Sequence, residues 1–351
     1  MTPGPARAGE GLAVGFDGTA LPDDVTALAE DAGLGGVVLF ARNCPSLEAV
    51  LALTAAARQL GPDVLVLVDH EGGRVHRLPP PFTRFPPAAA VGRAGDPGLA
   101  ARVARAMARE LRAAGFDSGL TPVLDCLTDP RSTVVGDRAF AADPETVAAC
   151  GAAFVEAALA EGLIPVAKHF PGHGRTALDS HATLPEVPVS RETLEREELL
   201  PFHRALAAGC PAVMVAHVRY PALDPAWPAS LSPAVIGGLL RTRLDFPGLV
   251  LSDDLDMKAV ADTWGTPTAA LRFLEAGGDL ALICRDPQAR TEARAAIETA
   301  LAGHRLDLAA ARSRRAALRR RVELHPRPPL SAIGDPDHRD LAAEIAGRAA
   351  T

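Results

Sequence analysis

The sequence predicts an α/β protein folded as a (β/α)8 TIM barrel, in a single domain with a short C-terminal extension. Eight short apolar runs recur along the 351 residues, and helix-like stretches separate most of them. Polar residues follow every run at the same end, as in barrels whose active site is built from loops at the carboxyl ends of the strands. Barrels of this length commonly fold as one domain.

Each predicted strand is an apolar run bounded by Gly, Pro or Asp. The runs occupy residues 12–16, 36–40, 64–68, 119–124, 164–167, 212–216, 249–251 and 280–284. The polar residues that follow the runs are Asp17, Arg42, Asn43, Asp69, His70, Glu71, Asp125, Lys168, His169, His217, Asp253, Asp254, Arg285 and Asp286. Because the carboxyl ends of barrel strands meet at one face, these side chains are expected to surround one site.

The predicted helices carry apolar residues at spacings of three and four. They include residues 97–114, 144–160, 191–208, 233–244 and 268–276. A doubly wound open sheet is the structural alternative, but no G-x-G-x-x-G motif follows the first run.

The chain changes character after about Pro326. Four prolines between 326 and 336 predict an irregular appendage, followed by a short helix near residues 339–348. We therefore divide the chain into a barrel domain over 1–325 and a tail over 326–351.

The composition indicates a small-molecule ligand. The formal charge is −7, and a basic patch at 312–321 is interpreted as a helix face, so nucleic acid is not expected as a partner. Two Trp and one Tyr offer little aromatic surface for stacking long sugar chains.

The five cysteines are odd in number and form no C-x-x-C pair, so we expect free thiols in a reducing compartment.

The N-terminal residues do not resemble a secretory signal, and no apolar run reaches membrane-spanning length. The expected location is the cytoplasm, without a membrane partner. The sequence does not define the oligomeric state, although a monomer is compatible with it.

The stretch from Lys168 to His181 is rich in titratable side chains. It contains one lysine, three histidines and a carboxylate, directly after a predicted strand. Asp179 and His181 are one residue apart, a spacing that in an extended segment places both side chains on one side. The carboxylate can then orient the imidazole as a general acid and base. The alternative is a capped loop with an incidental surface histidine.

Two further motifs follow predicted strands. In the stretch 252–256, Asp253 or Asp254 could be a nucleophile, or the pair could form a solvated acidic turn. In the stretch 69–77, Asp69 could accept hydrogen bonds from sugar hydroxyls, and one of the two arginines could donate to an oxygen or a carboxylate. Alternatively, an Asp-Arg ion pair could brace a loop.

Zinc is a further possibility, because a barrel metallohydrolase could use several of the histidines together with Asp253. The candidate ligands are His169, His173, His181 and His217. No H-x-H motif follows the first run and no H-E-x-x-H motif occurs, so we expect neither a metal nor another cofactor.

These residues together resemble the glycoside hydrolase family 3 β-N-acetylhexosaminidases of bacterial cell-wall recycling. The family signature K-H-(F/I)-P-G-H-G-x4-D-S-H is met by residues 168–181, and V-D-x-E-G-G-R-V-x-R by residues 68–77. Further similarity lies around Arg138, His217 and Asp253, and the resemblance spans about residues 12–284. His70 and Arg175 stand where the family commonly has other residues.

The resemblance implies a retaining hydrolase. Asp253 would attack the anomeric carbon, and His181, oriented by Asp179, would act first as acid and then as base. By the same similarity, an N-acetylglucosamine unit would be held by Asp69, Arg77, Arg138, Lys168 and His169, with His217 as a further candidate. The implied substrate is a small amino sugar, either an N-acetylglucosamine-containing muropeptide or a chitooligosaccharide.

Other functions remain open at this point. The same barrel could be a β-glucosidase, or a phosphorylase in which phosphate replaces water. A metal-dependent barrel hydrolase and a non-catalytic sugar-binding module are the alternatives outside this chemistry. The histidine motifs favour the N-acetyl sugar, because other branches of the family usually lack the Asp-His dyad.

Overall fold

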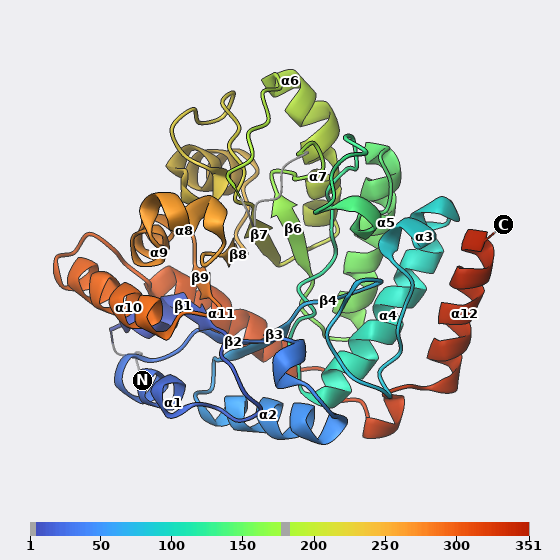
Figure 1. The fold of residues 1–351 in the computed structure, drawn as a ribbon, viewed down its shortest axis with the longest axis horizontal. Helices are drawn as coiled ribbons and strands as arrows, with labels where there is room; N and C mark the ends of the chain where they lie inside the picture. The colour runs from blue at the N-terminus through green and yellow to red at the C-terminus, as the bar shows by residue number, and fades with distance from the viewer. Residues whose placement is uncertain (1–4, 177–182, 351) are drawn as a thin grey trace.

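The computed structural model describes residues 5–176 and 183–350. Its centre is a curled sheet of seven parallel strands in the order β3-β2-β1-β9-β8-β7-β6, and the helices lie outside it (Figure 1). The strands are β1 (Leu12–Val14), β2 (Gly36–Leu39), β3 (Leu65–Val68), β6 (Val166–Phe170), β7 (Ala212–Val215), β8 (Leu249–Asp254) and β9 (Leu280–Ile283). Seven of the eight predicted strands are therefore confirmed.

The fourth predicted strand, 119–124, is wrong as a regular strand. Leu120 has a left-handed φ of 46°, and Pro122 has no N–H to donate to a ladder. The segment nevertheless hydrogen-bonds to both outer strands of the sheet. The His70 N–H, just after β3, donates to Gly119 at 3.0 Å, and the Lys168 N–H in β6 donates to Pro122 at 3.1 Å.

A short hairpin that was not predicted follows β3. It consists of β4 (His70–Gly72) and β5 (Val75–His76), paired antiparallel. The turn between them contains Gly73, which has a φ of 54°. A glycine fits this left-handed position because it has no Cβ.

Most of the predicted helices are confirmed within two residues. The helices α4 (Pro97–Ala114) and α5 (Pro144–Ala160) each begin with Pro after an aspartate that caps the helix, Asp96 and Asp143 respectively. The stretch 191–208 is composite, because a π-helical segment, Leu194–Glu198, lies between α6 (Arg191–Thr193) and α7 (Leu199–Ala207).

The structure contains further helices around the curled sheet. They are α1 (Asp23–Ala32), α2 (Leu47–Gln59), α3 (Ala88–Arg93), a π-helix at Ala234–Arg243, α8 (Lys258–Trp264), α9 (Thr266–Glu275), α10 (Pro287–Ala302), α11 (Ala309–Glu323) and α12 (Pro336–Ala350). No helix in the described part of the chain is long and apolar enough to cross a membrane.

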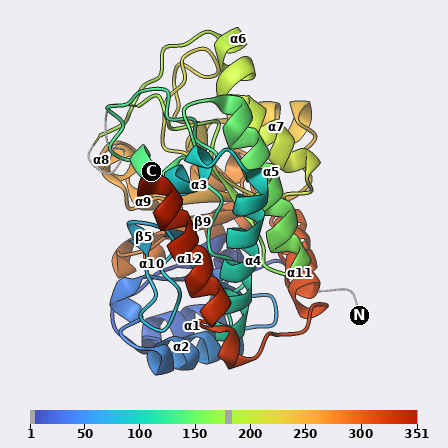
Figure 2. The same ribbon diagram turned by 90° about the vertical axis from the view of Figure 1, so that its right-hand side faces the viewer.

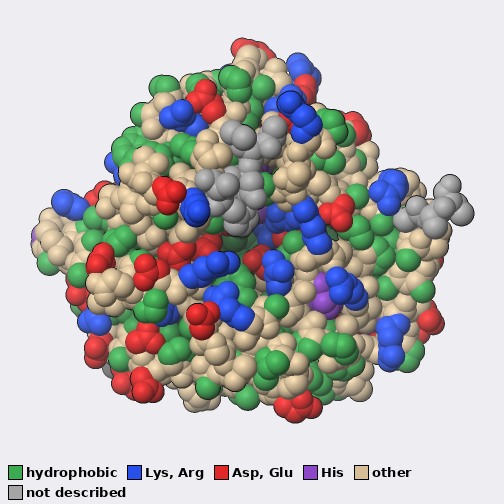
Figure 3. All heavy atoms as spheres, in the orientation of Figure 1, with side chains coloured by type: hydrophobic (Ala, Val, Ile, Leu, Met, Phe, Trp, Pro, Cys, Tyr) green, Lys and Arg blue, Asp and Glu red, His purple; other side chains and the backbone are tan. Residues whose placement is uncertain are grey.

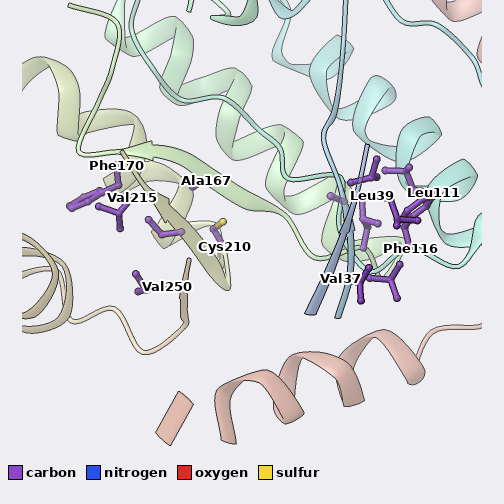
Figure 4. Close-up of a cluster of buried hydrophobic side chains, with 14 of the residues drawn as sticks. Val37, Leu39, Leu111, Phe116, Ala167, Phe170, Cys210, Val215 and Val250 are labelled. Carbon is purple, nitrogen blue, oxygen red and sulfur yellow. The ribbon is translucent and has the colours of Figure 1, made fainter. Parts of the chain in front are cut away.

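The hydrophobic core has an inner and an outer layer, because strand side chains alternate between the two faces of the sheet. Val37 and Leu39 of β2 belong to the outer layer, which packs against helices with residues such as Leu111 and Phe116 (Figure 4). Val38, between them, belongs to the inner layer, as do Leu120, Met214 and Leu282. The inner layer forms the floor beneath the strand ends. All five cysteines are buried and free, as predicted.

The basic patch at 312–321 lies within α11, and several of its arginines face the body of the protein while Arg320 and Arg321 are exposed. Arg314 bonds to Asp279 at 2.8 Å, and Arg319 lies 3.4 Å from Asp117. Both carboxylates are buried. The interpretation of this patch as a helix face is therefore confirmed.

The tail contains a longer helix than predicted, α12, which lies alongside α3 and α4 (Figure 2). His338 bonds to the buried Glu110 of α4 at 2.8 Å. Ile345 is fully buried and belongs to the outer core layer. The helix is thus packed against the body of the protein through His338, Leu341 and Ile345.

Candidate active site

A cavity of about 800 Å³ opens where the strands end. Its lining includes polar side chains at or just after the ends of β3, β6, β8 and β9, so the predicted gathering of polar groups at one end of the sheet is confirmed. Figure 3 shows the mouth as a hollow near the centre of one face, with Lys and Arg side chains around it. Of the nine residues to which the resemblance assigns catalytic or binding roles, six line the cavity: Asp69, Arg77, Arg138, Lys168, His169 and Asp253.

A network of ion pairs forms one wall. The Lys168 ammonium donates to Asp69 Oδ1 at 3.0 Å and lies 2.5 Å from Glu71 Oε1. Arg138 forms a bidentate pair with Glu71, with both distances at 2.8 Å. Burial alone would raise the pKa of Glu71, but the charges of Arg138 and Lys168 hold it well below its ordinary value. These contacts hold all four side chains in fixed positions, and they favour the charged forms of Glu71, Arg138 and Lys168.

His169 is oriented by a buried aspartate, Asp125, to which the sequence analysis assigned no role. Its Nδ1–H donates to Asp125 Oδ2 at 2.7 Å, and Asp125 Oδ1 accepts from the backbone N–H groups of His169 and His173 at 3.2 and 2.8 Å. Although burial acts in the opposite direction, the adjacent histidines lower the pKa of Asp125. His169 Nε2 is then the acceptor, 3.4 Å from Arg138 Nη2.

Asp253 and Asp254 lie at the end of β8 and have different environments. Burial would raise the pKa of Asp253, but His169 and His217 outweigh it and lower this pKa to about 2. For Asp254, burial together with the charges of Asp256 and Asp253 raises the pKa to about 7. Asp253 is thus an ionised carboxylate at the cavity, where it accepts a hydrogen bond from the Asp254 N–H at 2.8 Å.

His217 supports this strand end from behind the cavity. Its ring is buried, with Nε2–H donating to the Asp254 carbonyl at 3.0 Å and Nδ1 accepting from Ser230 Oγ at 2.7 Å. Arg77, by contrast, lines the cavity, and its buried Nε has no hydrogen-bond partner among the described residues. Arg77 therefore retains a donor for a ligand, whereas the contacts of His217 fix the backbone beside Asp253.

Two residues of the site, Glu71 and Asp125, were expected near the strand ends but were given no catalytic or binding role. A signal existed for each: Glu71 stands two positions after Asp69 in the D-x-E-G-G-R motif, and Asp125 directly follows the fourth apolar run. Asp179 and His181 lie outside the described residues. Within the described ranges, no group of three or more His, Cys, Asp or Glu side chains is arranged to hold a metal ion.

An ionised carboxylate beside anchored cations and an oriented histidine, at the carboxyl ends of parallel strands, is an arrangement suited to hydrolysis of a polar substrate. Residues 13–316 match the model of the glycosyl hydrolase family 3 N-terminal domain. The β-hexosaminidase of Methylococcus capsulatus is 45% identical over 267 residues, which cover 75% of this chain and 79% of the relative. That of Xylella fastidiosa is 40% identical over 306 residues, covering 85% and 89% of the two chains.

Solved structures agree with this similarity. A family 3 β-N-acetylglucosaminidase from a Paenibacillus species superposes with a TM-score of 0.92 at 34% identity, covering 97% of this chain and 68% of that one. NagZ from Neisseria gonorrhoeae, solved in complex with N-trifluoroacetyl-D-glucosamine, superposes with a TM-score of 0.81 at 30% identity, covering 99% and 100%. The chain belongs to glycosyl hydrolase family 3, and it is an O-glycosyl hydrolase of the β-hexosaminidase type.

Proposed function

We propose that this enzyme is a retaining β-N-acetylglucosaminidase that removes a non-reducing terminal N-acetylglucosamine from muropeptides. The observation that carries the proposal is the ionised Asp253 carboxylate in the cavity, beside the network formed by Lys168, Glu71 and Arg138. The similarity to β-N-acetylglucosaminidases and to a NagZ bound to an N-acylated glucosamine supports the choice of sugar.

In the first step, an oxygen of Asp253 forms a bond to the anomeric carbon as the bond to the leaving oxygen breaks. The leaving oxygen takes a proton from His181, which Asp179 orients. In the second step, His181 removes a proton from water, the water oxygen bonds to the anomeric carbon, and Asp253 is released. The two inversions restore the β configuration. The roles of Asp179 and His181 follow from the family motif alone.

The sugar is held by groups whose positions are already fixed. Asp69 and Lys168 are paired at 3.0 Å and can accept from and donate to hydroxyl groups. Arg138, His169 and Arg77 supply further polar contacts on the same cavity. Because ion pairs hold Lys168 and Arg138 before substrate arrives, little reorganisation is needed at the transition state.

The proposal extends to the architecture and location. The segment 117–124 bonds to both outer strands, which supports a closed eight-membered barrel in which this segment takes the fourth position. We further propose the division into a barrel over 1–325 and a tail over 326–351. A cytoplasmic location is in keeping with five buried, free thiols.

The test is hydrolysis of an aryl β-N-acetylglucosaminide beside the matching aryl β-glucoside. The wild type should prefer the N-acetyl sugar, and Asp253→Ala should lower kcat by about 10⁴-fold or more, because no covalent intermediate can form. Added azide should partly restore turnover of the activated aryl substrate and yield the α-glycosyl azide. Asp262→Ala, an exposed acid in α8, is the matched control and should retain full activity. Preference for the glucoside, or an active Asp253→Ala enzyme, would contradict the proposal.

A further inference from the structure

The charge of the cavity is opposite to that of the chain. The whole sequence carries a formal charge of −7, yet seven Lys or Arg side chains and five Asp or Glu side chains line the cavity. One of the five, Asp254, has its pKa raised to about 7 by burial and by neighbouring acids, so it contributes less than a full negative charge. A site for a neutral sugar alone would not need this excess of cations.

Most of these cations are already neutralised by the protein. Arg42 bonds to Asp17 at 2.7 Å and also to two backbone carbonyl oxygens. Arg74 bonds to Asp137 at 3.1 Å and to the carbonyl groups of Val134 and Val135. Arg138 and Lys168 share Glu71, as described above. These four side chains therefore have little charge to offer to a further anion.

Three of the seven cations, Arg77, Lys258 and Arg285, have no ion-pair or hydrogen-bond partner for their side chains among the described residues. Arg77 is only partly exposed and comes from the β5 side of the cavity, where the sugar is proposed to bind, whereas Lys258 and Arg285 lie elsewhere. Both line the cavity and are exposed. Holding two unneutralised cations close to one mouth is unfavourable in the absence of an anion. We call this pair the cationic rim.

The backbone fixes the position of the cationic rim. Lys258 begins α8, just after β8, and Arg285 follows β9, the neighbouring strand. Asp256 joins the two loops, because its Oδ2 accepts from the Arg285 N–H at 2.8 Å. Both cations are thus on the β8–β9 side of the mouth, whereas Asp69, Lys168 and their network come from β3 and β6.

Because of this separation, the two sides of the cavity suit different parts of a substrate. The network beneath β3 and β6 suits the hydroxyl groups of the sugar that is cleaved off. The group on the other side of the scissile bond projects toward the mouth, where the exposed rim lies. A flexible ammonium and a planar guanidinium together match a carboxylate, the guanidinium through two parallel hydrogen bonds.

Resting on the function proposed above, we propose that Lys258 and Arg285 select an aglycone that carries a carboxylate, in preference to a neutral second sugar. The enzyme then discriminates a muramic acid-type aglycone from a chitooligosaccharide by charge. The same cations could instead attract inorganic phosphate as an acceptor, and the experiment separates these two anions.

The experiment compares N-acetylglucosaminyl-β-1,4-N-acetylmuramic acid with the same disaccharide whose carboxylate is converted to the methylamide. The wild type should prefer the acid by about tenfold in kcat/KM, mostly through KM. The Lys258→Gln/Arg285→Gln enzyme should bring this ratio close to one, and each single variant should give an intermediate ratio. The preference of the wild type should also decrease as salt is raised.

Three controls make the result decisive. Hydrolysis of p-nitrophenyl β-N-acetylglucosaminide, which lacks the carboxylate, should change less than twofold in the double variant. Arg320→Gln, an exposed arginine of α11, should leave the substrate preference unchanged. Added phosphate should yield no N-acetylglucosamine 1-phosphate that depends on Lys258 and Arg285.

Outcomes against the inference are distinct from outcomes against the proposed function. An acid-to-amide ratio that is near one in the wild type, or unchanged in the double variant, would overturn the role of the rim. A phosphorylated product lost in the double variant would assign the rim to phosphate instead. A wild type inactive on the aryl N-acetylglucosaminide would overturn the proposed function itself.

Discussion

Glu71 connects more of the site than any single motif suggested. Its carboxylate joins Lys168 of β6 to Arg138, which comes from a distant loop, and so fixes two cations at once. The motifs were sufficient to predict Asp69, Lys168, Arg138, His169 and Asp253 at the cavity. They were not sufficient to identify Glu71 or Asp125 as supports, because such roles depend on contacts between segments that are far apart in sequence.

Removing the charge of Glu71 should therefore affect both activity and stability. Glu71→Gln keeps the shape of the side chain but leaves Lys168 and Arg138 without their buried counter-charge. We expect the free energy of unfolding in urea to fall by about 3 kcal/mol. We also expect kcat/KM to fall by roughly 100-fold, as for loss of a preorganised electrostatic contact. A variant that keeps wild-type kinetics would show that the network is not needed for catalysis.

The raised pKa of Asp254 predicts how the stability of the fold depends on pH. Its folded-state pKa of about 7 lies above the ordinary value of 3.8, so ionisation opposes folding. Its contribution favours the folded state fully below pH 4 and is lost as pH rises through 7. Asp254→Asn cannot ionise, so relative to the wild type it should gain about 1–3 kcal/mol of stability between pH 4 and pH 8. Urea unfolding at pH 4 and pH 8 measures the stability of both proteins. If stability depends on pH equally in the wild type and in Asp254→Asn, the raised pKa of Asp254 is contradicted.

Among the elements, the helices were the most predictable. The bounds of α4 and α5 follow from a capping aspartate, a proline at the first turn and periodic apolar residues, all of them local signals. The π-helical segment at Leu194–Glu198 has no such signal. In the structure, the buried Glu198 at its end bonds to Arg175 at 2.7 Å, a long-range contact that periodicity cannot reveal.

The segment 117–124 is also determined by long-range contacts. Its first residue, Asp117, is fully buried, and its carboxylate accepts from the Val66 N–H of β3 at 2.8 Å and from Arg58 at 2.6 Å. Arg319 of α11 lies 3.4 Å away. The residue therefore ties β3, α2 and α11 to this segment.

Asp117→Ala should destabilise the fold by about 3 kcal/mol, because it leaves two partly buried guanidinium groups and the buried Val66 N–H without their acceptor. The measurement is the urea midpoint of the variant beside that of Asp262→Ala, which removes an exposed acid. At low temperature, where the variant is folded, kcat on the aryl substrate should stay close to wild type, since Asp117 is remote from the cavity lining. A loss below 1 kcal/mol would argue that this segment is held by its backbone bonds alone.

At the scale of the whole molecule, the location of the polar site residues could be predicted from the sequence better than the packing of the tail. Prolines after residue 325 indicated an appendage, but α12 lies against α3 and α4 and buries Ile345 completely. The tail is thus part of the same packed core. Its helix could be predicted from local pattern, whereas its docking depends on the shape of the α4 surface.

Ile345→Ala tests whether the tail stabilises the rest of the fold. Truncating a fully buried isoleucine should cost about 2–4 kcal/mol, while kcat/KM per folded enzyme should not change because the tail does not line the cavity. Thermal unfolding followed by circular dichroism, together with aryl glycoside kinetics, gives both values. Two separate thermal transitions in the wild type would instead show an independent tail.

The central claim is that Asp253 forms a covalent bond to the sugar. The most direct measurement is mass spectrometry of the enzyme after incubation with a 5-fluoro-N-acetylglucosaminyl fluoride, which slows release of the intermediate. We expect one sugar added to the peptide that contains Asp253, and no addition in Asp253→Ala. A sugar attached to a different residue, or an enzyme that turns over the reagent with inversion and no adduct, would contradict it.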